Sequence, residues 1–198
     1  MPPGRCRCIC KCSITGAPCW RSERGRGTSM MDGDAANATG VARNLLIGIG
    51  NPLRGDDGVG RLLAEEWDDA CESIRVRSVH QLTPELVADL AGVDRVLFID
   101  AWLSPAAAAA PVLQRLSASA PSSVACGEAA LNSHHLTAAQ LLALARSLWN
   151  ADPEAALLRI PATDIAHGTR LSVAMELQLP AARRLVRQWL EVTALCMS

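Results

Sequence analysis

The sequence predicts an α/β protein with a single folded domain, in which a mostly parallel, twisted sheet of about five strands carries helices on both faces. Short apolar segments of strand length alternate along the chain with segments whose apolar residues repeat at helical spacing. No two strand segments are joined by the short turn of a hairpin, so we expect parallel pairing through crossovers. With 198 residues, 49% of them hydrophobic, the chain can build one substantial core.

The beginning of the chain has a composition that does not favour folding. Residues 1–43 combine Pro, Gly, Ser and Arg without a hydrophobic period, so they bury too little apolar surface to offset the entropy of ordering. The alternating cysteines from Cys6 to Cys12 offer a metal site as an alternative, but their spacing differs from the Cys-x2-Cys pairs of zinc sites. We therefore expect a disordered extension at 1–43 and a folded domain at 44–198.

Charge and cysteine usage indicate the compartment and exclude some partners. The 19 basic and 20 acidic residues leave a net charge of −1, which favours neither nucleic acid nor an anionic membrane as a partner. The chain lacks the apolar core of a signal peptide and any run of the roughly 18 apolar residues that a membrane span needs. Beyond the extension only Cys71, Cys126 and Cys196 remain, as in a reducing compartment. We expect a soluble, cytoplasmic monomer.

The first half of the domain begins with the apolar run 45–50, which is typical of a strand covered on both faces. A helix is predicted for 58–71, because apolar residues repeat there at helical spacing. Residues 74–80 alternate in polarity and predict a less buried strand. Thr83 followed by Pro84 marks the start of a second helix, with Thr83 as its N-cap.

The second half opens with 95–100, a further buried strand that is predicted to end on the carboxylate of Asp100. Residues 110–116, after an alanine-rich loop, predict a strand at the edge of the sheet. The remaining predicted elements are a helix at 136–149, a strand at 156–160 and a closing helix at 180–196.

Chemically active side chains follow the predicted strands. In an open parallel sheet, residues just past the carboxyl ends of the strands meet in one crevice. The residues in such positions are Asp56, Asp57, His80, Asp100 and His134, the last from the loop before a predicted helix. Two carboxylates and an imidazole suit a borderline divalent ion such as zinc or nickel. Because these residues are far apart in sequence, only the fold brings them together.

Each of these residues also has an ordinary structural interpretation. One of Asp56 and Asp57 can simply satisfy the free amides at a helix N-terminus. Asp100 can cap the turn after its strand, although a charge directly after an apolar strand more often serves function. His134 or its neighbour His135 can be a surface histidine. His167, in a polar loop, is expected to be solvated.

The glycine-rich turn after the first strand does not match the common phosphate-binding motifs. Gly48-x-Gly50 is followed by a gap of four residues before Gly55, where a dinucleotide fingerprint needs two. The turn also ends in two acids, which repel phosphate, and no Gly-Lys-Ser/Thr follows. No Gly-x-Ser-x-Gly motif is present, so the sequence offers no obvious nucleophile.

Four motifs, in order, resemble the nickel-iron hydrogenase maturation proteases. The first and most specific is Gly48-Ile-Gly-Asn-Pro-Leu-Arg-Gly-Asp-Asp-Gly-Val-Gly60; the others are Phe98-Ile-Asp-Ala101, Ser133-His-His-Leu136 and Leu171-Ser172. The resemblance implies three metal-binding residues, which by position are Asp57, Asp100 and His134. His135 is the less favoured histidine, and Asp56 is a candidate catalytic base or a loop organiser.

The same resemblance implies a metal-dependent, aspartic-type endopeptidase. Such an enzyme removes the C-terminal extension of a hydrogenase large-subunit precursor once nickel has been inserted, and the metal that it recognises is the substrate's own nickel. The alternative is a non-catalytic α/β module that binds a nucleotide or senses a metal.

Overall fold

A computed structural model describes residues 44–68, 70, 73–104, 109–117 and 136–195, with side chains up to residue 191. The predicted extension at 1–43 lies outside the described residues. The strands are β1 (Asn44–Ile49), β2 (Ile74–Val79), β3 (Arg95–Leu103), β4 (Val112–Leu116) and β5 (Glu154–Ala162). The helices are η1 (Gly55–Gly58), α1 (Val59–Glu65), η2 (Pro84–Leu86), α2 (Val87–Leu90), α3 (Ala138–Trp149) and α4 (Val173–Leu195), where η marks a 3-10 helix.

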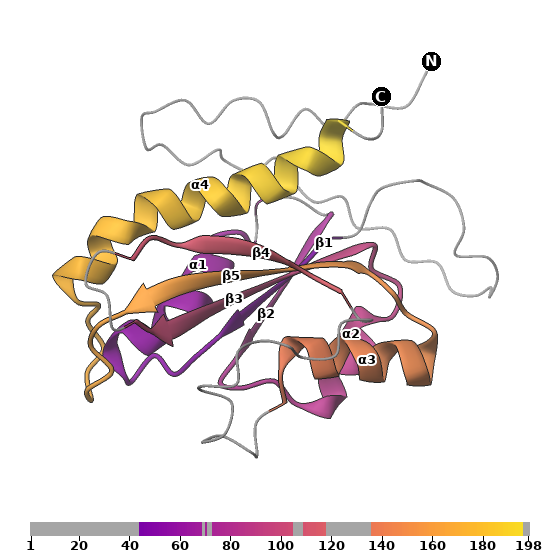
Figure 1. The fold of residues 1–198 in the computed structure, drawn as a ribbon, viewed down its shortest axis with the longest axis horizontal. Helices are drawn as coiled ribbons and strands as arrows, with labels where there is room; N and C mark the ends of the chain where they lie inside the picture. Colours follow the sequence, from indigo (N-terminus) through magenta and orange to yellow (C-terminus); the bar gives the residue numbers. More distant parts are fainter. Residues whose placement is uncertain (1–43, 69, 71–72, 105–108, 118–135, 196–198) are drawn as a thin grey trace, which may run out of the picture. The chain divides into compact units, whose positions relative to one another are not determined.

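The five strands form one sheet in the order β2-β1-β3-β5-β4 (Figure 1). β1 pairs in parallel with β2 and β3, and β3 pairs in parallel with β5. Among the described strands, the edge strand β4 alone is antiparallel, and it pairs with β5. The prediction of a mostly parallel α/β sheet of about five strands with an edge strand near 110–116 is confirmed.

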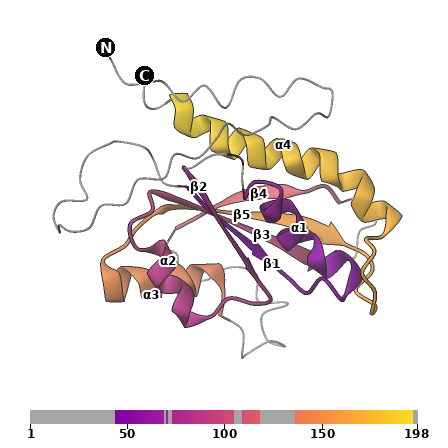
Figure 2. The same cartoon turned by 180° about the vertical axis from the view of Figure 1, so that it is seen from behind.

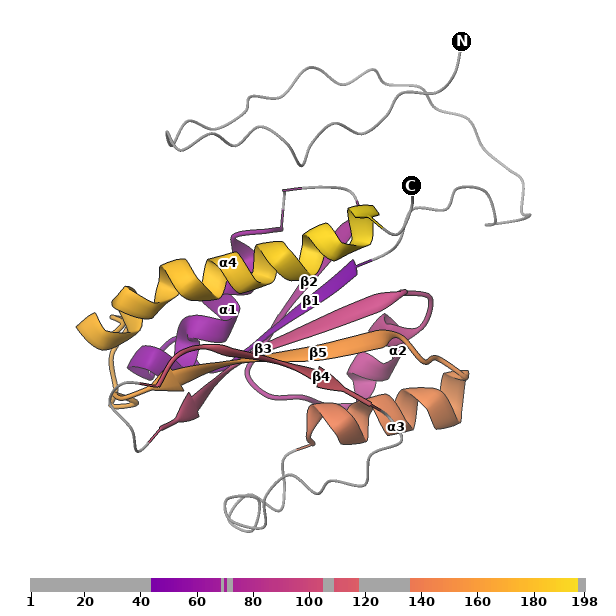
Figure 3. The ribbon, with the colours of Figure 1, turned by 45° about the horizontal axis from the view of Figure 1, so that its top comes forward.

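One face of the sheet is covered by α1 and α4, and the other by α2 and α3 (Figure 3). Because successive residues of a strand point to opposite faces, each central strand supplies both cores. In β3, Leu97 and Ile99 pack with α1 and α4, whereas Val96 and Phe98 pack with α2 and α3. This division explains why the central strands read as continuous apolar runs.

α1 follows β1 and leads to β2, and it lies on the sheet face that Figure 2 brings to the front. The predicted helix at 58–71 is too long, because α1 ends at Glu65. The backbone then tightens into turns with hydrogen bonds from residue i to residue i−3. The Trp67 nitrogen donates to the Ala64 oxygen at 3.0 Å, and the Asp68 nitrogen donates to the Glu65 oxygen at 3.3 Å.

Other details also differ from the predictions. β3 continues past Asp100 to Leu103 because β5 pairs with it along its whole length. α4 begins at Val173, ahead of Pro180, because its buried face already starts at Met175, and this packing offsets the hydrogen bond that proline cannot make. Thr83 precedes η2, but its side chain makes no capping hydrogen bond.

Candidate functional site

The candidate site lies at the carboxyl ends of β1 and β3. From β1 the chain passes through α1 to β2, which lies on one side of β1. It then crosses to the other side of β1 to form β3, so the strand order reverses between β1 and β3. Ligand sites of open α/β sheets form at such a reversal. The predicted residues stand here: Asp57 lies in η1, directly after β1, and Asp100 lies in β3, one position beyond the last β1 pairing at Ile99.

Two glycines allow η1 and α1 to pack directly on the ends of these strands. Gly50 has a φ of +133°, and a Cβ there would lie 1.8 Å from the Asp57 backbone oxygen. A Cβ on Gly60 would lie 2.3 Å from the backbone oxygens of both Ile49 and Ile99. Any larger residue would push the acidic turn away from the sheet. These glycines therefore set the position of Asp57.

Asp57 is held by its own turn and is partly buried. The Asn51 backbone nitrogen donates to Asp57 Oδ2 at 2.8 Å, and Asn51 Oδ1 in turn accepts from the Leu53 nitrogen at 2.9 Å. In the part of the chain that the structure describes, Asp57 Oδ1 accepts no hydrogen bond. Asp57 thus presents an oriented carboxylate with one oxygen available to a ligand.

Asp100 is also partly buried, and its pKa is raised to about 6. Burial is the main cause, and the negative charge of Asp57 is the second. The Ala101 backbone amide and the positive charge of Arg159 act in the opposite direction and lower the pKa of Asp100. The two carboxylates predicted to share a site therefore do lie close enough to repel each other, which is the electrostatic environment that a cation relieves.

Asp56 has a different environment from its neighbour. Its side chain is fully buried and accepts five hydrogen bonds. They come from the backbone nitrogens of Thr163, Asp164 and Ser172 at 3.0, 3.0 and 2.7 Å, and from the hydroxyls of Thr163 and Ser172 at 3.4 and 2.9 Å. Burial alone would raise the pKa of Asp56, but these hydrogen bonds outweigh it and lower the pKa. Of the two roles considered for Asp56, these contacts support the loop organiser.

The segment that Asp56 holds, residues 163–172 between β5 and α4, forms part of the site that the sequence analysis did not assign. Backbone bonds join it to the acidic turn: Gly55 N to Gly168 O at 2.8 Å, Gly168 N to Leu53 O at 2.9 Å, and Asp56 N to Asp164 O at 2.9 Å. The sequence offered two signals here: the Leu171-Ser172 motif and a dense run of small and polar residues that indicates a loop. Neither of them predicts the contacts of the segment.

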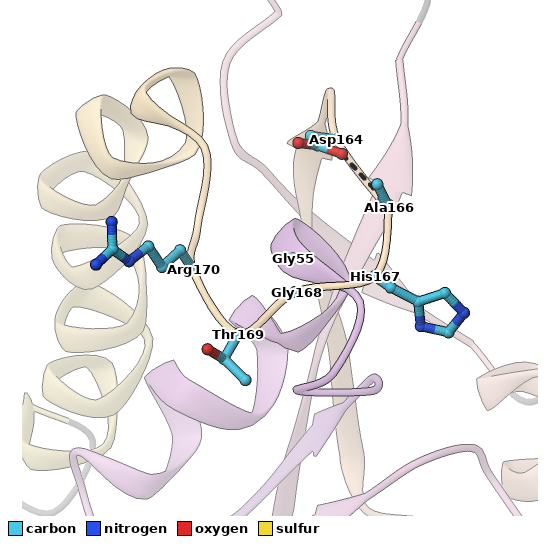
Figure 4. Close-up of a pocket in the computed structure, with 7 residues that line it drawn as sticks. All are labelled: Gly55, Asp164, Ala166, His167, Gly168, Thr169 and Arg170. Atoms are coloured by element: carbon cyan, nitrogen blue, oxygen red, sulfur yellow. Dashed lines mark hydrogen bonds between the residues drawn. The ribbon is translucent and has the colours of Figure 1, made fainter.

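A pocket of about 370 Å³ lies in this segment (Figure 4). Its lining residues are Gly55, Asp164, Ala166, His167, Gly168, Thr169 and Arg170. In Figure 4 the side chains of His167 and Arg170 point away from the loop in opposite directions. His167 is exposed, as predicted, and the pocket lacks the converging side chains expected of a catalytic centre.

The predicted histidines do not complete a metal site within the described residues. His80 follows β2 and is exposed. His134 and His135 lie outside the described residues, although α3, which begins at Ala138, starts on the sheet face to which Asp100 belongs. Among the residues that the structure describes, no group of three His, Cys, Asp or Glu side chains is placed to hold a metal. Metal binding by Asp57, Asp100 and His134 stays a prediction.

These features define a doubly wound α/β protein with a pair of repelling carboxylates where the strand order reverses. None of the helices in the described ranges is both long and apolar enough to cross a membrane. Comparison with protein-family models and with curated proteins finds no match.

Comparison with solved structures shows the fold of hydrogenase maturation endopeptidases. The hydrogenase-maturating endopeptidase HybD from E. coli aligns with a TM-score of 0.53 and 20% identity, over 73% of this chain and 89% of that chain. The [NiFe] hydrogenase maturation protease HycI from Thermococcus kodakarensis aligns with a TM-score of 0.57 and 19% identity, over 76% of this chain and 93% of that chain. The hydrogenase 2 maturation peptidase from a Thaumarchaeota archaeon aligns with a TM-score of 0.53 and 23% identity, over 75% of this chain and 97% of that chain.

Proposed function

We propose that this protein is an endopeptidase that removes the C-terminal extension of a nickel-iron hydrogenase large-subunit precursor after nickel insertion. The observation that carries the proposal is the Asp57–Asp100 pair at the strand reversal of a fold shared with hydrogenase maturation endopeptidases. Fold alone is weak support for a function, because one fold hosts many activities. The acidic pair adds a site with a definite chemical preference.

That preference is for a cation. The negative charge of Asp57 helps to raise the pKa of Asp100, so a positive ion between the two carboxylates would relieve their repulsion, and oxygen ligands suit divalent metals. In the proposed reaction the ion is the nickel that the precursor already contains, bound by Asp57 and Asp100 and by His134 from the segment before α3. A precursor without nickel lacks this contact, so the site distinguishes loaded from unloaded substrate.

The remaining features of the proposal concern setting and chemistry. The enzyme acts as a monomer in the cytoplasm, where the precursor is its partner and neither nucleic acid nor a membrane is required. Water attacks the scissile carbonyl, the nickel bound in the substrate polarises reacting groups near it, and carboxylates of the site accept the proton. Asp56 contributes by holding the acidic turn against residues 163–172, which supports the organiser role over that of a base.

The experiment is a processing assay with purified, nickel-loaded large-subunit precursor followed by intact mass spectrometry. The wild-type protein should shorten the loaded precursor at its C-terminus and leave the metal-free precursor at full length. Asp57→Ala, Asp100→Ala and His134→Ala should abolish shortening. Asp89→Ala serves as the control, because Asp89 pairs with Arg75 and Arg77 away from the candidate site.

Two results would refute the proposal: a loaded precursor that keeps its extension with the wild-type protein, or full processing by all three variants. The alternative module predicts a different outcome. In that case the protein would retain a nucleotide or bind nickel without any change in the mass of the precursor.

A further inference from the structure

Arg159 lies beside Asp100 at the carboxyl end of the sheet. It is the register partner of Asp100 across the parallel pairing of β5 with β3. Residues paired in this way project from the same face of the sheet. The side chains of Asp100 and Arg159 therefore share the face covered by α2 and α3, at the carboxyl end where the candidate site lies.

The Arg159 side chain is held in place by Trp102. Its guanidinium carbon lies 4.6 Å from the centre of the Trp102 ring. Trp102 is two residues beyond Asp100 on β3, so it points to the same face. Stacking on an aromatic ring uses the flat surface of a guanidinium and leaves the in-plane N–H groups free to donate. Stacking on Trp102 thus orients the Arg159 guanidinium and leaves its N–H groups available for hydrogen bonds to a ligand.

A second stacked arginine, Arg95, has a purely structural role and serves as a comparison for Arg159. Arg95, at the start of β3, also stacks on a tryptophan, 4.2 Å from the centre of the Trp189 ring. Its donors are used internally: Nη1 bonds the Trp189 backbone oxygen at 2.9 Å, and Nε lies 3.3 Å from a Glu154 carboxylate oxygen. Across the described residues, the Arg159 guanidinium makes neither an ion pair nor a hydrogen bond. The same stacking arrangement therefore serves a different purpose at Arg159.

We infer that Arg159 donates hydrogen bonds to the carbonyl oxygen of the scissile peptide bond and stabilises the oxyanion that develops there. This inference rests on the proposed function. When the oxygen of water bonds to the carbonyl carbon, the π electrons of the C=O bond move to the carbonyl oxygen, which becomes negative. When that oxyanion collapses, the C=O bond re-forms and the C–N bond breaks. The leaving nitrogen takes the proton that water lost, and the products are a carboxylic acid and an amine, which then ionise to a carboxylate and an ammonium group.

The charge distribution favours a carbonyl oxygen over a carboxylate as the group that Arg159 meets. Asp100 is paired with Arg159, and its charge, together with that of Asp57 near it, repels any ligand that arrives with a negative charge. A neutral peptide carbonyl avoids that repulsion in the bound substrate and becomes negative only in the transition state. A fixed guanidinium then stabilises the transition state more than the bound substrate, which raises kcat with little effect on KM.

The test compares Arg159→Met and Arg159→Lys with wild type in the processing assay, with kcat and KM measured separately. Methionine keeps apolar contact with Trp102 but removes the charge, and lysine keeps the charge but loses the planar donor pair. Assays at about pH 8 keep Asp100 ionised in all proteins, so a changed carboxyl pKa does not contribute. The control is Arg115→Met on β4, because the Arg115 side chain is 84% exposed at the opposite end of the sheet.

We expect Arg159→Met to lower kcat by about 100-fold or more while KM changes less than about threefold. Arg159→Lys should lie between Met and wild type, and Arg115→Met should match wild type. Unchanged kcat in both Arg159 variants, or a loss confined to KM, would overturn the inference while leaving the proposed function in place. If circular dichroism shows that Arg159→Met is unfolded, the kcat of Arg159→Lys decides. A wild-type protein that leaves the loaded precursor intact would overturn the proposed function and this inference with it.

Discussion

The Asp56 carboxylate accepts hydrogen bonds from both the backbone nitrogen and the hydroxyl of Ser172, at 2.7 and 2.9 Å. The Ser172 hydroxyl also accepts from the Met175 nitrogen at 3.1 Å, so it caps the first turn of α4. One buried carboxylate therefore joins the turn after β1 to the beginning of the last helix. The next residue in sequence, Asp57, lies in that turn, and its charge helps to raise the pKa of Asp100.

Replacing Asp56 should destabilise the fold. Asp56→Asn keeps the shape of the side chain but removes its charge and turns amide hydrogens toward several buried donors, so the free energy of unfolding should fall by about 3 kcal/mol. Urea unfolding followed by circular dichroism measures the change. Asp164→Asn is the matched control, because the hydrogen bond that the Asp164 carboxylate accepts from the Ala166 nitrogen at 2.9 Å is exposed to solvent. Equal stabilities of the two variants would contradict the organiser role.

Stability of the metal-free protein should depend on the ionisation of Asp100. Its pKa is raised to about 6 in the folded state, above its value in the unfolded chain, so the folded state binds the proton more tightly. The stabilisation is complete below the unfolded pKa of about 4 and is lost as pH rises through about 6, a change on the order of 2 kcal/mol. Urea midpoints at several pH values should show this contribution in wild type. Asp100→Asn should lack it, and an identical pH profile for the two proteins would count against a raised pKa.

The pKa of Asp100 should depend on the charge of Asp57. Asp57→Asn removes the like charge beside Asp100, so the pKa of Asp100 should fall toward its ordinary value while the contribution of burial remains. NMR titration of the Asp100 carboxyl carbon reports this pKa directly. Asp89→Asn should leave it unchanged, since Asp89 pairs with Arg77 on β2 at 2.7 Å. An Asp100 pKa that is the same in wild type and in Asp57→Asn would show that the two groups do not share a site.

The position of the acidic turn should depend on Gly50. Gly50→Ala introduces a Cβ at a φ of +133° and 1.8 Å from the Asp57 backbone oxygen, so the turn must move. We expect a loss of more than about 2 kcal/mol in the free energy of unfolding, together with loss of processing. Gly168→Ala is the control, because a Cβ there meets no atom within 4 Å and φ is not in the left-handed region. Processing by Gly50→Ala at the wild-type rate would show that the turn tolerates displacement.

Local sequence patterns were sufficient to predict the elements of the sheet. β1 and the first part of β3 are apolar runs that need cover on both faces, and the absence of hairpin turns between strands predicted parallel pairing. Boundaries were less accurate where tertiary packing decides them. β3 extends past Asp100 because β5 pairs with it there, and α4 contains Pro180 because the buried face around Met175 begins earlier.

The sequence by itself determined the α/β fold, the tight glycine turn and the presence of two adjacent acids at its end. Only the tertiary structure decided what each acid does: the Asp56 carboxylate is buried and bonded to Ser172, and Asp57 lies close enough to Asp100 to raise its pKa. The same holds for Arg159, which reaches the candidate site only through its register with Asp100. The physical reason is that periodicity records the environment of a segment along the chain, whereas strand order and register decide which distant side chains share an edge.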